Sequence, residues 1–189
     1  VRVMANSLLA HFPRIAERCI LVNPFGGEQA RLANRQGMKQ AIAWMRSGGA
    51  LVIFPSGEVS SLDIRRRQIA DPPWSQTVAR LARLAQVPVL PLYFEGRNSI
   101  AFQLAGVIHP RLRTALLVRE FLNKSGKTLV TRVGNLISPR KLDDMAGDSE
   151  RIEYLRRKTY VLANRQEPRK ALPSMVVFPP RQSRLVSEE

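Results

Sequence analysis

Three short apolar runs separated by two helical segments constrain the fold of this chain more than any other feature. The runs at 19–22, 50–54 and 87–94 have the length of buried strands. Between them, residues 28–46 and 74–86 carry apolar side chains at the spacing of an amphipathic helix. Strands joined through helices pair in parallel by right-handed crossovers, and helices then cover the sheet. We therefore expect an α/β fold with a mostly parallel central sheet flanked by helices.

The remaining segments are less regular, and their periodicity gives weaker predictions. We expect the end of a helix at 2–11, a polar loop at 61–73, helices at 99–106 and 111–121, a strand at 127–133, a loop at 135–140 and a long basic helix at 142–165. Residues 1–165 have the size of one domain. Residues 166–189 form a tail rich in Pro and Arg, which we expect to be poorly ordered, with a short strand at 175–178 as an option.

Cysteine usage and hydropathy limit the class of protein. The chain has one cysteine, Cys19, so a disulfide framework and a cysteine-based metal site are excluded, which fits a reducing compartment. Cys19 is either a reactive thiol or a small apolar strand residue, and its place in an apolar run favours the second. No apolar run has the length of a membrane-spanning helix, and no secretory signal opens the sequence.

The net charge of +15, carried mostly by arginine, predicts an anionic partner. Nucleic acid, anionic lipid headgroups and an acidic carrier protein all satisfy that description, and the charge does not choose among them. A nucleic-acid-binding protein explains the charge, but no helix-turn-helix, zinc or RNA-binding signature is present, and aromatic residues make up only 6% of the chain.

The strand at 50–54 ends in a turn of small and polar residues, which are candidate ligand contacts. Pro55 removes a backbone donor, and Gly57 permits a conformation or close approach that a side chain would forbid. Glu58 and Ser60 follow directly. A strand that stops in small and polar residues is how α/β proteins build sites at the carboxyl edge of a sheet. Taken alone, the local chemistry of the segment favours an ordinary strand-to-loop turn.

The order of these features resembles the glycerolipid (lysophospholipid) acyltransferase family, in particular its bacterial branch of hemolysin-like or ornithine-lipid acyltransferases. The family's Phe-Pro-Glu-Gly-Thr-Arg-Ser block is matched by residues 54–60, and its Val-Pro-x-x-Pro strand by residues 87–92. A strand-and-turn block corresponds to residues 20–25, and Asp71-Pro-Pro-Trp74 opens the intervening helix. The resemblance covers roughly residues 1–165.

The sequence departs from the family pattern at the catalytic block and at two arginine positions, and these departures change which residues can be assigned a role. The catalytic His-x-x-x-x-Asp block is missing, because Ala16 and Thr114 lie five residues after His11 and His109. We expect that block upstream of an N-terminally truncated chain, so no catalytic residue is assigned here. Val59 replaces an arginine of the family's pattern, and Asn23-Pro24 stands where another is usual. Headgroup contacts then fall to Arg31, Arg35 or Arg65, although each is also typical of a solvated surface charge.

The resemblance implies acyl transfer from an acyl carrier protein or coenzyme A to the hydroxyl of a lysolipid. It needs no metal and no bound cofactor. The implied substrate-binding residues are Phe54, Pro55, Ser56, Gly57, Glu58, Ser60, Pro88 and Pro91. Glu58 favours a neutral or zwitterionic acceptor, such as a lyso-ornithine lipid, over lysophosphatidic acid. Replacing Glu58 by Thr and Val59 by Arg is expected to shift that preference.

The implied location is the cytoplasmic face of the inner membrane, where the positive charge attracts anionic lipid and, in addition, an acidic carrier protein. Residues 98–121 mix apolar and basic side chains, which suits either an interfacial surface or a packed helix with a basic outer face. A catalytically inactive scaffold of the same fold is the alternative within the family. We expect negligible turnover from residues 1–189 alone.

Overall fold

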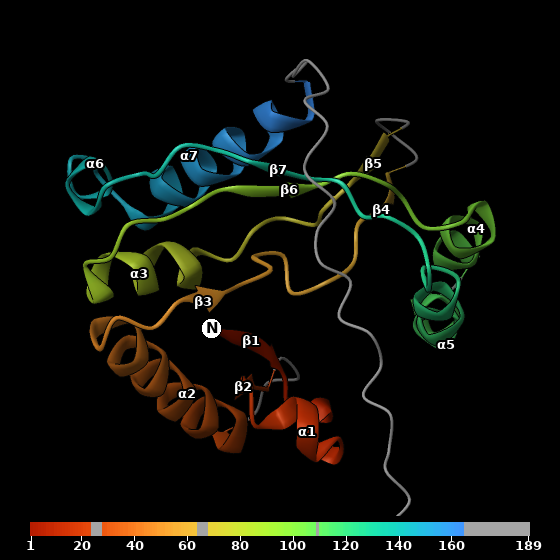
Figure 1. The fold of residues 1–189 in the computed structure, drawn as a ribbon, viewed down its shortest axis with the longest axis horizontal. Coiled ribbons are helices and arrows are strands. Elements are labelled where there is room, and N and C mark those ends of the chain that lie inside the picture. The colour runs from red at the N-terminus through yellow and green to blue at the C-terminus, as the bar shows by residue number, and fades with distance from the viewer. Residues whose placement is uncertain (24–27, 64–67, 109, 165–189) are drawn as a thin grey trace, which may run out of the picture.

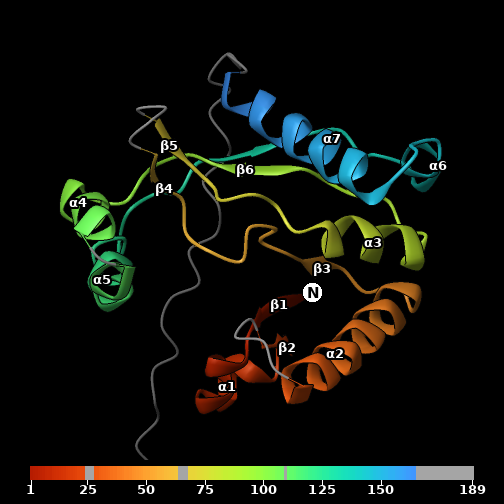
Figure 2. The ribbon, with the colours of Figure 1, turned by 180° about the vertical axis from the view of Figure 1, so that it is seen from behind.

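The computed structural model describes residues 1–23, 28–63, 68–108 and 110–164 (Figures 1 and 2). Its centre is a three-stranded parallel sheet in the order β2–β1–β3, formed by β1 (Arg2–Asn6), β2 (Cys19–Val22) and β3 (Leu51–Val52). Val3 pairs with Cys19 on one side and with Val52 on the other. The α/β class and the parallel pairing are confirmed.

The prediction of a helix at 2–11 is wrong. Residues 2–6 form β1, the middle strand of the sheet, and only the 3-10 turn η1 (Ser7–His11) is helical. Its neighbours on both sides supply backbone hydrogen bonds that an isolated segment would lack, and such non-local pairing overrides local periodicity. The short helix α1 (Pro13–Ala16) then leads into β2.

The two central helices follow the prediction closely. Helix α2 (Glu28–Arg46) is followed by Ser47 and the glycines 48 and 49, and Gly48 adopts a positive φ of 86°. Helix α3 (Gln76–Ala85) begins at Ser75, whose hydroxyl accepts a hydrogen bond from the Thr77 amide, and ends at Gln86 in the left-handed conformation.

The segment 61–73 contains a hairpin, which corrects the prediction of a loop. Strands β4 (Ser61–Asp63) and β5 (Gln68–Ala70) pair antiparallel, with Leu62 opposite Ile69. Three consecutive arginines between them hid the strand signal, since charged runs are typical of loops. Residues 64–67 lie outside the described residues.

The apolar run 87–94 does not join the parallel sheet. Its last residues form β6 (Leu92–Phe94), which pairs antiparallel with β7 (Thr131–Val133), and Val89 makes an isolated bridge to Ile137. The predicted strand at 127–133 is thus shorter in the structure, and residue 137 of the expected loop takes part in β-pairing.

The second half of the chain is helical. Helices α4 (Ile100–Ile108) and α5 (Pro110–Leu122) form a hairpin at one edge of the molecule, near the predicted bounds (Figure 1). The single helix predicted at 142–165 is wrong: α6 (Pro139–Asp143), α7 (Asp148–Tyr160) and the 3-10 turn η2 (Val161–Asn164) take its place. Buried Arg151 stabilises the break because its guanidinium donates to the carbonyls of Leu142 and Met145 at the end of α6.

Helix α3 joins two apolar clusters. Its Leu81 packs with Ile20 and Ala41 under the parallel sheet, while its Ala79 and Ala82 pack against α6 and α7. Cys19 is half-buried in β2, which fits the structural role over the reactive one. Within the described residues, no helix is long and apolar enough to cross a membrane. The predicted tail, with its optional strand at 175–178, lies outside the described part of the chain.

Candidate functional site

The segment Phe54–Ser60 leaves β3 as a tight turn and leads into the β4–β5 hairpin. The Gly57 amide donates to the Phe54 carbonyl at 3.0 Å, and Gly57 adopts a φ of +67°, which explains the glycine at that position. The Ser56 hydroxyl donates a hydrogen bond to the Glu58 carbonyl at 2.8 Å, and this bond within the turn stabilises it. Residues 57–59 are left exposed at its tip.

Asp71 holds the far end of this loop. One carboxylate oxygen accepts a hydrogen bond from the Ser60 hydroxyl, and the other accepts one from the Trp74 indole at 3.0 Å. The near end is held by the Ser75 amide, which donates to the Pro55 carbonyl at 2.9 Å. Segments on either side of the hairpin are thereby tied to the start of α3.

Two residues of α7 hold the backbone of Asp71 itself. The Asp71 amide donates to the Tyr160 hydroxyl, and the Arg156 guanidinium donates to the Asp71 carbonyl, both at 3.0 Å. The Arg156 guanidinium also lies over the Tyr160 ring, 5.6 Å from its centroid. Burial raises the pKa of Tyr160 above its ordinary value, and the nearby Asp71 carboxylate adds to that effect. Tyr160 is therefore a neutral phenol at physiological pH.

Aromatic side chains surround the loop on the β6 side. The rings of Phe54 and Phe94 lie 6.3 Å apart, centroid to centroid, and both are exposed. Behind them, Tyr160 contacts both Tyr93 and Trp74 at ring separations of 6.2 and 6.3 Å. The loop thus presents an apolar edge next to a polar, braced turn, a combination suited to an amphipathic ligand.

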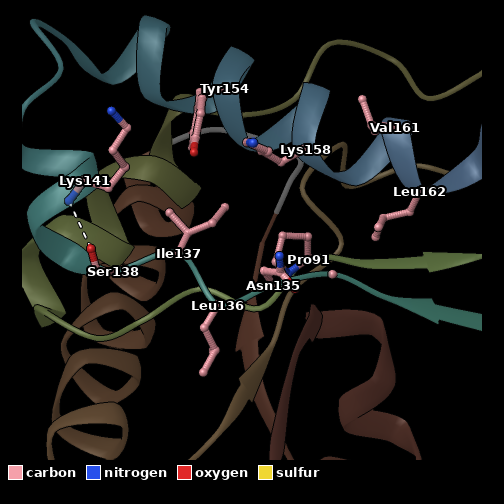
Figure 3. A pocket seen from close by; sticks show the side chains of 11 residues that line it. Pro91, Asn135, Leu136, Ile137, Ser138, Lys141, Tyr154, Lys158, Val161 and Leu162 are labelled. Carbon is pink, nitrogen blue, oxygen red and sulfur yellow. Dashed lines mark hydrogen bonds between the residues drawn. The ribbon is translucent and has the colours of Figure 1, made fainter. Parts of the chain in front are cut away.

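The two predicted proline contacts fall in different surroundings. Pro88 is exposed, whereas buried Pro91 lines a cavity of about 520 Å³ between the segment 134–138 and α7 (Figure 3). Its polar lining includes Lys141, Tyr154 and Lys158, and its apolar lining includes Pro91, Ile137 and Leu162. No residue of the loop 54–60 lines this cavity.

Two of the three predicted headgroup contacts, Arg31 and Arg35, belong to α2. Arg31 and Arg35 are exposed on α2, whose first turns lie beside α1 in both views, while the loop leads to the β4–β5 hairpin (Figures 1 and 2). Arg65 and His109 lie outside the described residues. His11 closes η1 and is exposed. The chain 1–108 and 110–164, as far as it is described, holds no cluster of acidic, His or Cys side chains suited to a metal ion.

Sequence reasoning missed Asp71, Arg156 and Tyr160. The Asp-Pro-Pro-Trp order before α3 was a usable signal, since prolines fix the backbone between the carboxylate and the indole it binds. The contribution of α7 had no local signal, because Tyr160 lies 89 residues from Asp71 in the chain. The hydroxyl proton of Ser60 is directed to Asp71, so in this state Ser60 offers a ligand an acceptor oxygen.

Comparisons with known proteins identify the family. A family model described as acyltransferase matches residues 1–168. Two curated lyso-glycine lipid O-acyltransferases, from Phocaeicola vulgatus and Bacteroides thetaiotaomicron, are each 28% identical over 171 residues, or 86% of this chain. The chain spans 58% and 59% of the length of these relatives. No solved structure matches. With the family model covering most of its length, this chain belongs to the acyltransferase family.

Proposed function

We propose that this chain carries the acceptor-binding part of a lysolipid O-acyltransferase, which moves a fatty acyl group onto the hydroxyl of a lipid with an amino-acid headgroup. The observation that carries the proposal is the braced loop Phe54–Ser60, found at the place of the family's acceptor block and flanked by exposed Phe54 and Phe94. The two relatives are named for activity on a lyso-glycine lipid, which supports this class of acceptor.

The reaction sets the roles that the loop has to fill. The acceptor hydroxyl oxygen attacks the thioester carbonyl carbon, its proton passes to a base, and the carbon–sulfur bond breaks to release a thiol. The loop's part is to hold the acceptor in position. Exposed Glu58 attracts an ammonium group and repels a phosphate, while Phe54 and Phe94 contact the acyl chain that the acceptor already carries.

Ornithine and glycine headgroups differ in charge, and Glu58 discriminates between them by that difference. An ornithine headgroup carries an ammonium group beside its carboxylate, and the ammonium pairs with Glu58, whereas a glycine headgroup carries a carboxylate alone. Glu58 therefore favours the ornithine lipid as acceptor, the finer assignment within the same class. The acyl donor in the proposal is an acyl carrier protein or coenzyme A thioester, and the enzyme works peripherally at the cytoplasmic face of the inner membrane.

Acceptor binding is tested by the fluorescence of Trp74, whose indole binds the same carboxylate as Ser60. The chain has two tryptophans, so W44F leaves Trp74 as the reporter. In detergent, we expect lyso-ornithine lipid to bind at least tenfold more tightly than lysophosphatidic acid. The E58T/V59R variant should reverse this preference, while E153T, on the exposed face of α7, should leave it unchanged. Equal affinity of the unchanged loop for both lipids would refute the role of Glu58.

Turnover is tested separately with acyl carrier protein and coenzyme A thioesters. Because neither histidine begins a His-x-x-x-x-Asp motif, we expect residues 1–189 to bind the acceptor without turning it over. Robust product formation, read by mass spectrometry, would contradict the assignment of the base outside these residues. Failure to bind any lysolipid, together with no turnover, would instead favour a non-catalytic scaffold of the same fold.

A further inference from the structure

The hairpin of α4 and α5, here called the α4–α5 arm (residues 100–122), stands at one edge of the molecule. In both ribbon views it lies away from α2, α3 and α7 (Figures 1 and 2). The main packing partner of α5 among the described elements is α4, and α4 in turn lies against β4. Helix α5 is thus the outermost layer on this side of the described fold.

The arm is built as an ordered element. Glu120 of α5 is only 5% exposed, and its carboxylate accepts hydrogen bonds from the amide and the hydroxyl of Ser99 at the start of α4. The Glu120 pKa is lowered, first by the side-chain bond from Ser99, so this carboxylate is ionised at neutral pH. Phe102 is fully buried, and the Gln103 side-chain oxygen accepts a hydrogen bond from the Leu62 amide of β4 at 2.9 Å.

Large apolar side chains nevertheless point outward from this ordered arm. On α4, Ile100, Leu104 and Val107 are exposed and follow one another at the spacing of a single helix face; Ile100 is 74% exposed. On α5, Leu112 and Leu122 are exposed on the face that also carries exposed Arg119, and Phe121 at the helix end is 79% exposed. Soluble proteins rarely leave such side chains grouped at the surface without a partner.

The basic residues of the same region indicate that its partner is negatively charged. Glu120 is the only acidic residue between positions 96 and 142, and its carboxylate is used inside the arm. Basic residues occur at 97, 111, 113, 119, 124 and 127 in and around the arm. Aliphatic stripes bordered by arginine and lysine, in a stretch of sequence whose one acidic residue is the buried Glu120, match a bilayer interface with anionic headgroups. Nucleic acid would use the charge but leave the aliphatic stripes uncovered.

The arm also lies next to the candidate site. Helix α4 packs on β4, which directly follows the loop 54–60, and the chain enters α4 six residues after Phe94. Phe94 in turn contacts Phe54 of the loop. A bilayer that covered the arm would therefore bring lipid acceptors to the edge where the loop is exposed.

We propose that the α4–α5 arm is the surface by which this protein docks on an anionic lipid bilayer, with the aliphatic stripes in the interface and the flanking cations on the headgroups. The proposal rests on the proposed function only for the biological role of docking. Its physical evidence is the exposed apolar side chains and the positive charge of the arm. Arg97 and Arg119 contact lipid phosphates, and Leu104 and Phe121 enter the acyl boundary.

Flotation with vesicles tests the proposal. The vesicles hold phosphatidylcholine with or without phosphatidylglycerol, and contain neither lysolipid nor acyl donor, so the result is independent of acyl transfer. We expect binding to the anionic vesicles only. L104S/F121S should lower partitioning at least tenfold, since each side chain transfers a large apolar area, and R119E should lower it severalfold. The matched controls L32S on α2 and R157E on α7, both at exposed positions, should stay within twofold.

The depth to which the arm enters the bilayer is measured with an environment-sensitive dye attached to a single cysteine. In a C19S background, a dye at L104C should shift its emission to the blue with anionic vesicles, and a dye at L32C should not. Circular dichroism establishes that each variant is folded. Arm variants that float like the unchanged protein would overturn the proposal. So would an unshifted dye at position 104, or conversion of a dimer to a monomer by L104S/F121S without loss of vesicle binding.

Failure of this proposal differs from failure of the proposed function. Arm variants measured in detergent should keep the acceptor affinity read by Trp74, because the loop 54–60 is untouched. Loss of vesicle binding with retained acceptor binding supports the arm as a docking surface. Retained vesicle binding with no acceptor binding would remove the acyltransferase role and leave the arm in place.

Discussion

Removing the Asp71 carboxylate is expected to release the loop Phe54–Ser60 and to destabilise the domain. In D71A, the Ser60 hydroxyl and the Trp74 indole both lose their acceptor. Hydrogen bonds to a charged group contribute roughly 1.5–3 kcal/mol each. Because Asp71 is only partly buried and the two bonds share one group, we expect a loss of about 3 kcal/mol rather than the upper sum. That is a large share of the roughly 5–15 kcal/mol typical of a domain.

The variant D71N separates charge from geometry. An asparagine keeps one acceptor oxygen for Trp74, while its amide donates to Ser60, whose hydroxyl then turns to accept. Both contacts survive without the charge, so we expect a loss of about 1 kcal/mol. S60A, which removes one bond and leaves the carboxylate on Trp74, should lie between these two.

Urea unfolding followed by circular dichroism measures these losses. At a slope near 2 kcal/mol per molar urea, D71A should lower the midpoint by roughly 1.5 M with an unchanged slope. D144A provides the control, because exposed Asp144 follows α6 at a surface position, and should stay within about 0.5 kcal/mol of the parent. A free energy of unfolding for D71A within that same margin would refute the bracing role of Asp71.

Three further perturbations follow from single contacts. The pKa of Tyr160 is raised by burial, so the folded state keeps its proton above pH 10 while the unfolded state loses it; stability should fall as pH rises past about 10, and Y160F should remove that dependence in urea unfolding. R151K should cost roughly 2–3 kcal/mol, because an ammonium cannot reproduce the fork that binds two carbonyls and Asp148. G49A would place a Cβ 2.2 Å from the Trp44 ring, so it should lower the melting temperature and shift tryptophan emission.

Each of these expectations has a contrary outcome. An unchanged alkaline dependence in Y160F would assign it to another group. An R151K variant as stable as the parent would show that the carbonyls at the end of α6 are satisfied without the guanidinium. Unshifted emission in G49A would mean that the backbone at position 49, and not the Trp44 ring, moves aside.

Local sequence determined the elements whose signals are contained within a few turns of chain. Helix α2 was predictable because its apolar spacing and its glycine stop lie side by side, and α3 because Ser75 caps a regular stripe. The turn at residues 54–57 was also readable, since Gly57 occupies a positive φ that other residues resist. The family assignment rested on the local blocks at residues 54–60 and 87–92 and is confirmed by the family model.

Tertiary structure alone decided the identity of β1, the partner of β6 and the bracing of the loop. Strand β1 carries apolar residues at a spacing that fits a helix, and only pairing with β2 and β3 makes it the centre of the sheet. Asp71 acquires its role from Ser60, eleven residues away, and from Tyr160, 89 residues away. Such contacts depend on how distant segments meet in space, because a side chain's local spacing carries no information about the surface opposite to it. The sequence therefore located the loop that we propose binds the acceptor, and the fold showed what holds it in place.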